Sequence, residues 1–374
     1  MIRGARVAQL IESDGPGGAE RTAVNLASAL QDEGCYSLLI LPARGEGWLG
    51  REAAAAGLPT EYFDLDHPIS PRGAQWLEET FRKHRITLAH SHEFTMTVYS
   101  AWAAWRAGIG HVATMHGSRY YAERLRRRLA LRVAFTLGGQ FVAVSNQLAT
   151  RLSRDLWIRQ TSIRTIPNGV RWNSSAWPSV RDELRLGSTD TLILAVGNLY
   201  PVKGHQYLIE ALARLTERRP NAHVAIAGRG ELQESLRTQA HMLGLEDHVH
   251  LLGLRSDIPA LLTAADVFAL PSLSEGLPLA LVEAMFAGRP IVASDVGEVR
   301  TVLNDGEAGL LVEPGNAEQL AHALDGLLSH PDEAKRLGDA AARRAGTDYD
   351  VARMVTRYAE VYQQLAPHSV RGPA

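Results

Sequence analysis

The sequence predicts an α/β protein built from two Rossmann-like domains, each with a parallel sheet. Short apolar runs alternate with longer amphipathic stretches along the chain, which is typical of doubly wound sheets. The alternation occurs twice, once in each half of the sequence. A length of 374 residues is long for one hydrophobic core and suits two.

The expected strands are short apolar segments of the kind that lie buried in parallel sheets. They are residues 7–11, 37–41, 86–90, 111–115 and 140–144 in the first half, and 191–196, 223–227, 266–270 and 290–293 in the second. The segments expected to be helical include 19–31, 95–107, 331–346 and 350–365.

A segment without sustained periodicity separates the two halves. Residues 166–187 contain Pro167-Asn168-Gly169 and Pro178, which indicates a turn followed by a linker. We therefore predict two domains, 1–180 and 181–350, followed by a C-terminal helix and tail, 351–374, that is a candidate to pack back on the first domain. Because ligands bind beyond the carboxyl ends of parallel strands, the predicted site is a cleft between the two sheets.

Composition excludes several classes of function. The formal net charge of -2 gives no reason to expect a nucleic-acid partner. Cys35 is the only cysteine, so neither an internal disulfide nor a cysteine-based metal site can form. No apolar run approaches the roughly 20 residues of a membrane-spanning helix. We therefore predict a cytoplasmic protein, and the sequence gives no indication of its oligomeric state.

The strongest local signal is a carboxylate in an apolar helix. Residues 265–278 indicate a strand, a loop and the start of a helix, and residues 279–287 are apolar except for Glu283. A helix that is apolar all round is buried, and a buried carboxylate needs hydrogen-bond donors. The two hydroxyls of a ribose would serve, although a buried arginine is an equally good partner on the spacing alone.

A second glutamate, Glu275, lies in the loop ahead of this helix. The backbone N–H groups of Gly276 and Leu277 are unpaired at that position and face any anion or hydroxyl presented to them. The plain alternative is that Glu275 only interacts with the helix dipole.

Two glycine loops follow expected strands. Residues 197–204 contain Lys203, one of only three lysines in the chain, and a compact ammonium group at a strand end can neutralise a diphosphate. A surface lysine at a helix start is the alternative. In the other loop, Gly17 and Gly18 precede a helix, so the backbone can approach an anion closely.

Five short motifs together resemble the group 1 retaining glycosyltransferases of the GT-B fold. They are Gly-Gly-Ala-Glu at 17–20, Thr-Met-His-Gly at 114–117, Ile-Pro-Asn-Gly-Val at 166–170, Pro-Val-Lys-Gly at 201–204, and the glutamate pair at 275 and 283. The similarity extends over residues 7–365 and is densest between 251 and 314. It implies two Rossmann-like domains that face each other across a cleft, with residues 1–180 binding the acceptor and residues 181–350 binding the nucleotide sugar.

The resemblance also implies a role for each motif residue. His116, Lys203 and Glu275 would be the catalytic residues: His116 beside the transferred sugar, Lys203 on the diphosphate and Glu275 on the sugar hydroxyls. Glu283 would hold the ribose. The remaining donor contacts that it implies are Gly17, Gly18, Asn198, Gly228, Arg229, Arg255, Gly276 and Leu277, with the base near 228–230 and 252–255.

One position departs from the family pattern. Many members carry an arginine where this chain has Asn198, so Arg229 or Arg255 is expected to add charge at the diphosphate.

The predicted activity is retaining transfer of a hexosyl or N-acetylhexosaminyl group from a nucleoside-diphosphate sugar, UDP- or GDP-linked, to a hydroxyl acceptor. A glycan, lipid-linked or small-molecule acceptor in cell-envelope or polysaccharide synthesis would fit. No metal or other cofactor is expected: Asp64 and Asp66 indicate a solvated turn, and His90 and His92 indicate structural or cleft-lining histidines. A nucleotide-sugar epimerase and a catalytically idle nucleotide-sugar-binding protein are the alternatives.

A basic segment is a candidate for peripheral contact with an anionic membrane. Residues 119–132 contain a single acid, Glu123, and their apolar residues fall at helical spacing, so we expect one basic amphipathic helix. A solvated helix is the alternative. The arginines of this segment are Arg119, Arg124, Arg126, Arg127, Arg128 and Arg132.

Overall fold

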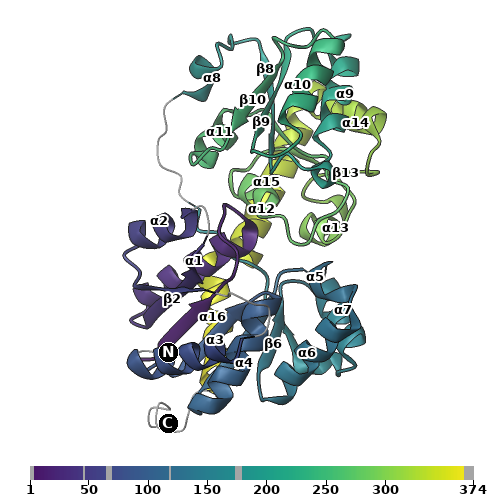
Figure 1. Cartoon of the computed structure of the whole chain (residues 1–374). Coiled ribbons are helices and arrows are strands. Elements are labelled where there is room, and N and C mark those ends of the chain that lie inside the picture. The colour runs from purple at the N-terminus through teal and green to yellow at the C-terminus, as the bar shows by residue number, and fades with distance from the viewer. Residues whose placement is uncertain (1–3, 45–46, 65–69, 118, 173–178, 366–374) are drawn as a thin grey trace. The chain divides into compact units, whose positions relative to one another are not determined.

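The computed structural model describes residues 4–44, 47–64, 70–117, 119–172 and 179–365. Its contacts divide the chain into two compact units, Met1–Arg171 with Tyr349–Ala374, and Trp172–Asp348. Each unit contains one parallel sheet with helices in the crossover connections, as the alternating pattern predicted (Figure 1).

The sheet of the first unit has seven strands in the order β3-β2-β1-β4-β5-β6-β7. The order reverses beside β1, which pairs with both β2 and β4, and such a switch point is where open sheets bind ligands. The strands are β1 (Arg6–Leu10), β2 (Tyr36–Pro42), β3 (Thr60–Phe63), β4 (Leu88–His92), β5 (Gly110–Met115), β6 (Gln140–Ala143) and β7 (Ile163–Thr165).

Helices of the first unit pack on this sheet. The final helix of the chain is among them, since Tyr358 and Tyr362 share a core with Val7 and Val142. Gly169 allows this close approach, because a Cβ there would lie 2.7 Å from the Cα of Val351. The helices are α1 (Gly18–Asp32), α2 (Trp48–Ala55), α3 (Pro71–Lys83), α4 (Phe94–Ala107), α5 (Arg119–Ala122), α6 (Leu125–Thr136), α7 (Asn146–Leu156), η1 (Gln160–Ser162) and α16 (Val351–Leu365).

The sheet of the second unit has six strands in the order β10-β9-β8-β11-β12-β13. The strands are β8 (Thr191–Val196), β9 (Ala222–Ala227), β10 (Val249–Gly253), β11 (Val267–Leu270), β12 (Ile291–Ser294) and β13 (Leu310–Val312). The helices are α8 (Val180–Glu183), η2 (Pro201–Lys203), α9 (His205–Thr216), α10 (Gln233–Met242), α11 (Ile258–Ala264), α12 (Leu279–Phe286), α13 (Val299–Val302), η3 (Asn304–Gly306), α14 (Ala317–Ser329) and α15 (Pro331–Asp348).

The predicted strands are present, and the strands without a prediction are all edges. β3 and β7 border the first sheet, and β10 and β13 border the second. An edge strand is paired on one side only, so its sequence need not form a continuous apolar run.

Three predicted boundaries need correction. The first unit ends at Arg171 rather than at 180, and the second at Asp348 rather than at 350. β4 covers Leu88–His92 instead of 86–90, because its polar end is buried and hydrogen-bonded within the unit. Residues 173–178 of the predicted linker and 366–374 of the tail lie outside the described residues.

The basic segment is two helices rather than one. α5 ends at Ala122 and α6 begins at Leu125, because Arg124 has an extended backbone with φ of -127°. On α6, Leu131 is buried against the unit, whereas Leu125 and Val133 are each 58% exposed.

Candidate functional site

In the second unit, the structure brings Lys203 and Glu275 together. The Lys203 ammonium donates to the Glu275 carboxylate at 2.7 Å, and the Ser272 hydroxyl donates to the same oxygen at 2.6 Å. Lys203 belongs to η2 after β8, and Glu275 lies in the loop after β11. The Glu275 side chain is only 7% exposed, so this pairing offsets part of its desolvation.

Backbone contacts between loops fix this pair. The Leu273 N–H donates to the Val202 carbonyl at 2.8 Å, which ties the glutamate loop to the lysine loop. Gly204 has φ of +65°, and a Cβ there would lie 2.1 Å from the Pro271 carbonyl oxygen. Only glycine has both the conformation and the space that this approach requires.

A third loop supports the glutamate loop from β12. Gly297 has φ of +54°, and a Cβ at this position would lie 2.0 Å from the backbone carbonyl oxygen of Glu275. The Glu298 N–H also donates to the Gly276 carbonyl at 3.4 Å. The position of Glu275 therefore depends on close backbone packing that the sequence motif alone does not show.

Gly228 is also required by backbone packing. A Cβ there would lie 1.9 Å from the Gly197 carbonyl oxygen. The next residue, Arg229, accepts the Leu199 N–H at its backbone carbonyl at 2.9 Å. These bonds close the loop after β9 onto the lysine loop, which places Asn198 and Arg229 in neighbouring loops.

His205, the first residue of α9, also belongs to this region although no sequence motif predicted it. Its ring is buried beneath the lysine loop, with Nε2 3.2 Å from the Gly197 carbonyl oxygen. Burial lowers the pKa of His205 to about 4, so the ring is neutral near pH 7. The glycines at both ends of the loop indicated a role for Lys203. No feature of the sequence indicated a role for His205.

Arg255 is held by two carboxylates. Its Nη2 donates to Glu183 at 2.9 Å and to Asp257 at 2.7 Å, and these bonds raise the pKa of the guanidinium above its ordinary value. A diphosphate would have to compete with both carboxylates, so the structure gives Arg255 a structural role and leaves its donor role a prediction.

Three more predicted donor residues, Gly276, Leu277 and Glu283, lie on or just before α12. Pro278 is the N-cap of this helix, and Gly276 and Leu277 come just before it. Glu283 is half-buried on α12, whose Val282 and Met285 are fully buried.

In the first unit, His116 follows β5 and lies against the end of β4. Its Nε2 is 3.0 Å from Nδ1 of His92, and the two rings stack with centroids 5.3 Å apart. Asn168 places its side-chain nitrogen 3.5 Å from Nδ1 of His116. Burial lowers the pKa of His116 to about 4, so the ring is neutral at neutral pH.

Glu93 is a second residue that the sequence analysis passed over. It is the N-cap of α4 with φ of +65°, a strained value for a residue with a side chain. Its carboxylate accepts the backbone N–H of His116 at 3.1 Å. Burial raises the pKa of Glu93 to about 8, with the carboxylates of Glu12 and Glu20 adding to the shift. Its position directly after a strand was the available signal.

The glycine loop of the first unit ends at α1 as predicted. Gly17 is the N-cap and Gly18 the first residue of the helix. A Cβ at Gly17 would lie 2.3 Å from a carboxylate oxygen of Glu20, so a carboxylate already occupies part of the space beside this helix N-terminus.

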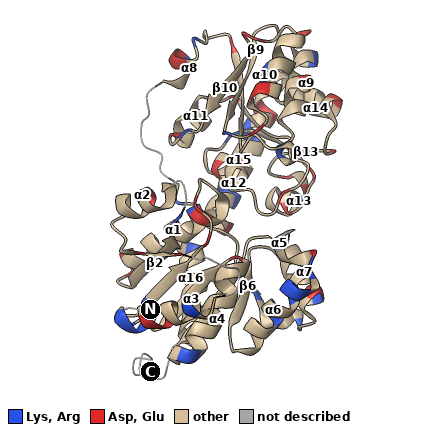
Figure 2. Cartoon of the chain, in the orientation of Figure 1, with Lys and Arg blue, Asp and Glu red and all other residues tan. Residues whose placement is uncertain are grey.

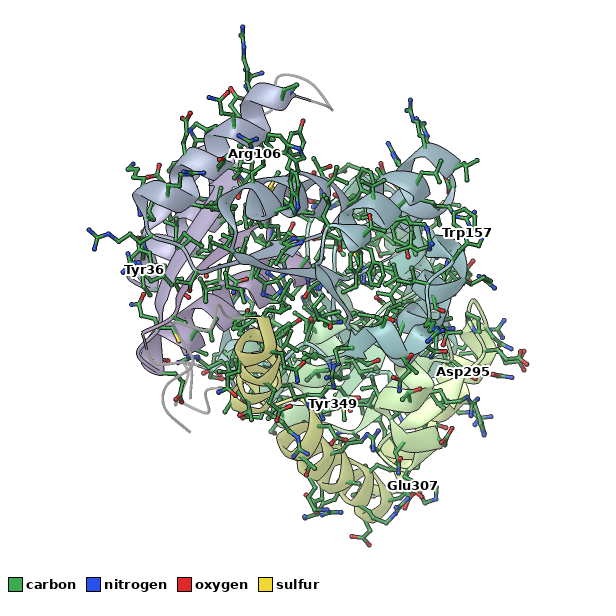
Figure 3. The ribbon with its side chains drawn as sticks, turned by 90° about the horizontal axis from the view of Figure 1, so that it is seen from below. Tyr36, Arg106, Trp157, Asp295, Glu307 and Tyr349 are labelled. Atoms are coloured by element: carbon green, nitrogen blue, oxygen red, sulfur yellow. The ribbon has the colours of Figure 1, made fainter. Side chains whose placement is uncertain are left out.

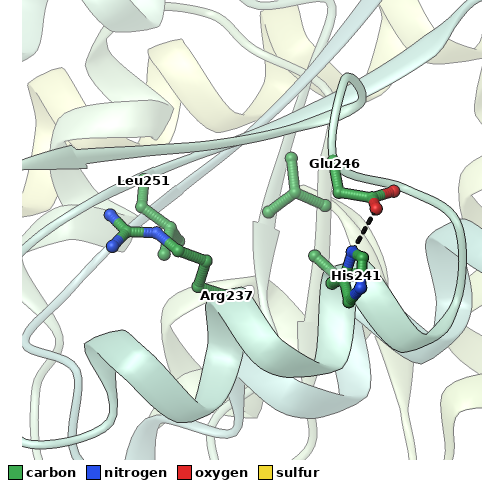
Figure 4. Close-up of a pocket in the computed structure, with 6 residues that line it drawn as sticks. Arg237, His241, Glu246 and Leu251 are labelled. Atoms are coloured by element: carbon green, nitrogen blue, oxygen red, sulfur yellow. Dashed lines mark hydrogen bonds and ion pairs between the residues drawn. The ribbon is translucent and has the colours of Figure 1, made fainter.

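A pocket of about 440 Å³ lies between α10 and β10 (Figure 4). It contains none of the predicted site residues. Its lining residues are Arg237, Ala240, His241, Glu246, Val249 and Leu251.

Within the described residues, no group of three or more histidine, cysteine, aspartate or glutamate side chains is arranged to hold a metal ion. Asp64 accepts a hydrogen bond from Arg44 at 3.1 Å, and Asp66 lies outside the part of the chain that the structure describes. No helix among the described residues is long and apolar enough to cross a bilayer.

Both units match the models of known glycosyltransferase families. Residues 178–344 match the model described as "Glycosyl transferases group 1", and residues 16–171 match "Glycosyltransferase Family 4". The chain belongs to the group 1 glycosyltransferases, and its fold class is GT-B.

Curated relatives and solved structures agree with this assignment. The phosphatidyl-myo-inositol mannosyltransferase of Mycobacterium leprae is 30% identical over 380 residues, 94% of each chain. A glycosyltransferase from Rickettsia africae has the same fold, with a TM-score of 0.87 at 21% identity over 97% of this chain and 98% of that one. Anabaena Alr3699/HepE, solved with UDP-glucose, has a TM-score of 0.82 at 26% identity over 96% of this chain and all of that one.

Proposed function

We propose that this chain is a metal-independent, retaining glycosyltransferase that moves a hexosyl or N-acetylhexosaminyl group from a UDP-linked sugar to a hydroxyl acceptor. The observation that carries the proposal is the Lys203–Glu275–Ser272 cluster at the strand ends of the second unit. The solved complexes of HepE with UDP and with UDP-glucose favour uridine over guanosine in the donor.

The cluster suggests how the donor would bind. The diphosphate of the donor would replace Glu275 as the partner of the Lys203 ammonium. The Glu275 carboxylate would then accept hydrogen bonds from sugar hydroxyls. Negative charge grows on the leaving diphosphate as the anomeric bond breaks, so a fixed ammonium lowers the barrier there. Glu283 would hold the ribose, and His116 would lie beside the transferred sugar.

Retention is proposed to arise without a protein nucleophile. The acceptor hydroxyl would approach from the side of the leaving group and pass its proton to a departing phosphate oxygen. The transition state would resemble an oxocarbenium ion, as in glycoside hydrolysis.

Incubation of the enzyme with UDP-glucose, UDP-N-acetylglucosamine or GDP-mannose and a panel of acceptors tests the proposal. We expect transfer from a UDP sugar in the presence of EDTA, with an α-linked product from an α-linked donor by NMR. Inverted product would contradict retention, and loss of activity with EDTA would contradict metal independence. Conversion of the sugar without acceptor would instead indicate an epimerase, and tight binding without turnover an idle binding protein.

We also propose that α6 lets the enzyme act on a lipid-linked acceptor at the cytoplasmic face of an anionic membrane. The exposed Leu125, Leu129 and Val133 form one stripe on the helix, beside the exposed Arg124 and Arg126. Basic residues, blue in Figure 2, gather on α6 and α7. An apolar stripe flanked by arginines is typical of helices that lie in a bilayer surface.

Not all arginines of the segment are available for this role. Arg128 donates to the Asp155 carbonyl at 2.7 Å, and Arg132 donates to the Leu156 carbonyl at 2.7 Å, so both hold the end of α7. Arg128 also lies over the ring of Trp157, 4.5 Å from its centroid, at the periphery of the unit (Figure 3). The charge available to lipids is therefore expected to come from Arg124 and Arg126.

Flotation with anionic vesicles tests the membrane proposal. We expect binding at low salt that weakens at high salt and is lost in the double variant Arg124→Gln/Arg126→Gln. The charge-matched control, Arg218→Gln/Arg237→Gln, changes two exposed arginines of the second unit. Wild-type protein that stays unbound at low salt would contradict the proposal.

A further inference from the structure

A continuous chain of buried polar side chains leads from α16 to His116. The hydroxyl of Tyr362 is 2.6 Å from Nδ1 of His90 and 3.3 Å from the side-chain nitrogen of Gln9. The side-chain oxygen of Gln9 is 2.9 Å from Nε2 of His92, whose Nδ1 is 3.0 Å from Nε2 of His116. Gln9, His90 and His92 are fully buried, so no solvent is available to satisfy them.

The orientation of Gln9 sets the direction of the bonds toward His116. The Gln9 oxygen can only accept, so Nε2 of His92 must donate to it. Burial holds the pKa of His92 well below its ordinary value, so the ring is neutral and carries one proton. Its Nδ1 is then a lone pair, and Nε2 of His116 must carry the hydrogen that points to it.

The hydrogen bonds on the α16 side of Gln9 are consistent with this direction. The side-chain nitrogen of Gln9 donates to the Tyr362 hydroxyl, which can donate in turn to Nδ1 of His90. Nε2 of His90 then donates to the Thr114 hydroxyl at 2.7 Å, and Thr114 lies 2.9 Å from the Tyr358 hydroxyl. Every group between α16 and His116 is thus used once as donor and once as acceptor.

We propose that Gln9 and His92 are positioning residues that hold His116 in the tautomer with hydrogen on Nε2, so that its Nδ1 lone pair accepts a hydrogen bond from a substrate hydroxyl. The Asn168 nitrogen makes a long hydrogen bond of 3.5 Å to Nδ1, which a substrate hydroxyl can replace, and His116 is only half-buried. The substrate part of this inference rests on the proposed function. The tautomer part stands on the hydrogen-bond geometry and on the burial that keeps His92 neutral.

The tautomer can be read directly by ¹H–¹⁵N NMR of the histidine side chains in the full-length protein. We expect an unprotonated Nδ1 and a protonated Nε2 for His116, with resonances assigned through a His116→Gln variant. The opposite tautomer in the wild-type protein would overturn the inference and leave the proposed transferase activity untouched.

A pair of variants at Gln9 tests the positioning role. Gln9→Met removes the acceptor, so His116 should populate both tautomers. Gln9→Glu keeps an acceptor oxygen toward His92 and should retain the wild-type tautomer. Ser91→Ala is the matched control. It removes a buried hydrogen bond of 2.9 Å to a different histidine, His111, which does not belong to the series of hydrogen bonds that leads to His116. Unchanged His116 signals in folded Gln9→Met would contradict the role of Gln9.

Kinetics separate positioning from simple stability. Gln9→Met should lower kcat by about tenfold, as expected for one weakened hydrogen bond, with a smaller change in the donor KM. Gln9→Glu should restore most of kcat at a temperature where both variants are folded. Equal kcat in the two variants, with the tautomer lost only in Gln9→Met, would show that the tautomer does not serve catalysis.

Discussion

The lysine–glutamate cluster of the second unit and the histidine network of the first unit are built on different physical principles. The cluster pairs full charges on loops, with Lys203 27% exposed. The network joins neutral groups that are fully buried, such as His90 and His92. A charged, partly exposed site suits an anion that must enter and leave, whereas a buried neutral network suits the fixed direction of a hydrogen bond.

The two regions also differ in how they are held. Backbone approaches at Gly204, Gly228 and Gly297 fix the cluster, so its geometry depends on residues without side chains. Side chains from β1, β4, β5 and α16 fix the network. We therefore expect variants of the cluster to change donor binding and to have the largest effect on turnover. Variants of the network should change the His116 tautomer and stability, with a smaller effect on turnover.

The largest expected effect is at Lys203. Lys203→Met removes the ammonium aimed at the leaving diphosphate, and we expect kcat to fall by roughly 10²–10³-fold, by analogy with a lost oxyanion donor. Steady-state kinetics with a UDP sugar measure this. Lys83→Met, at an exposed lysine of the first unit, is the control. Near-wild-type turnover in Lys203→Met would contradict the role of Lys203 at the leaving diphosphate.

Substitution at Gly297 should disturb the cluster through the backbone. Gly297→Ala places a Cβ 2.0 Å from the Glu275 carbonyl at a positive φ, so we expect a loss of about 1–3 kcal/mol in unfolding free energy and weaker UDP binding. Gly244 has φ of +67° and open space around it, so Gly244→Ala carries the conformational cost without the contact. Equal melting temperatures and UDP affinities in the two variants would show that loop packing does not position Glu275.

The pH dependence of stability should report the buried carboxyl of the first unit. The pKa of Glu93 is raised from 4.5 to about 8, so between these values the folded state keeps a proton that the unfolded state has lost. In the folded-to-unfolded transition Glu93 therefore loses its proton, so stability should fall as pH rises toward about 8 and level off above it. Denaturant titrations between pH 7 and 9 measure this, a window above the ordinary pKa of histidine. Glu93→Gln should flatten the profile, and an unchanged slope would contradict the raised pKa.

The smallest expected effect is at the α16 end of the network. Tyr358→Phe removes the hydroxyl 2.9 Å from Thr114, so we expect a loss of about 1 kcal/mol in unfolding free energy with little change in UDP affinity. Tyr62→Phe, at a tyrosine of β3 that is 54% exposed, is the control. A large loss of UDP affinity in Tyr358→Phe would contradict the claim that the histidine network does not contribute to UDP binding.

The sequence predicted the cluster better than the network. Lys203 and Glu275 each lie in a short motif directly after a strand, and parallel sheets bring strand ends together. Gln9, Thr114 and Tyr362 come from three distant segments, and each looks like an ordinary strand or helix residue. Their contact depends on the packing of α16 on the first sheet, which no local pattern records.

The fold was predictable to the same extent. Central strands such as β2 and β8 are largely apolar because they are buried on both faces, and the sequence pattern indicated them. The edge strands β3, β7, β10 and β13 lacked that signal. β4 was displaced in the prediction because buried histidines replace apolar residues at its end.

Calorimetric titration of UDP and of uridine into wild-type protein and Lys203→Met tests the central claim most directly. The account predicts that UDP binds the wild type more tightly than uridine, and that the substitution weakens UDP by about 10- to 100-fold, the range for a charge-assisted bond, while leaving uridine unchanged. Equal affinities of UDP for the two proteins would contradict the assignment of the lysine loop to the diphosphate.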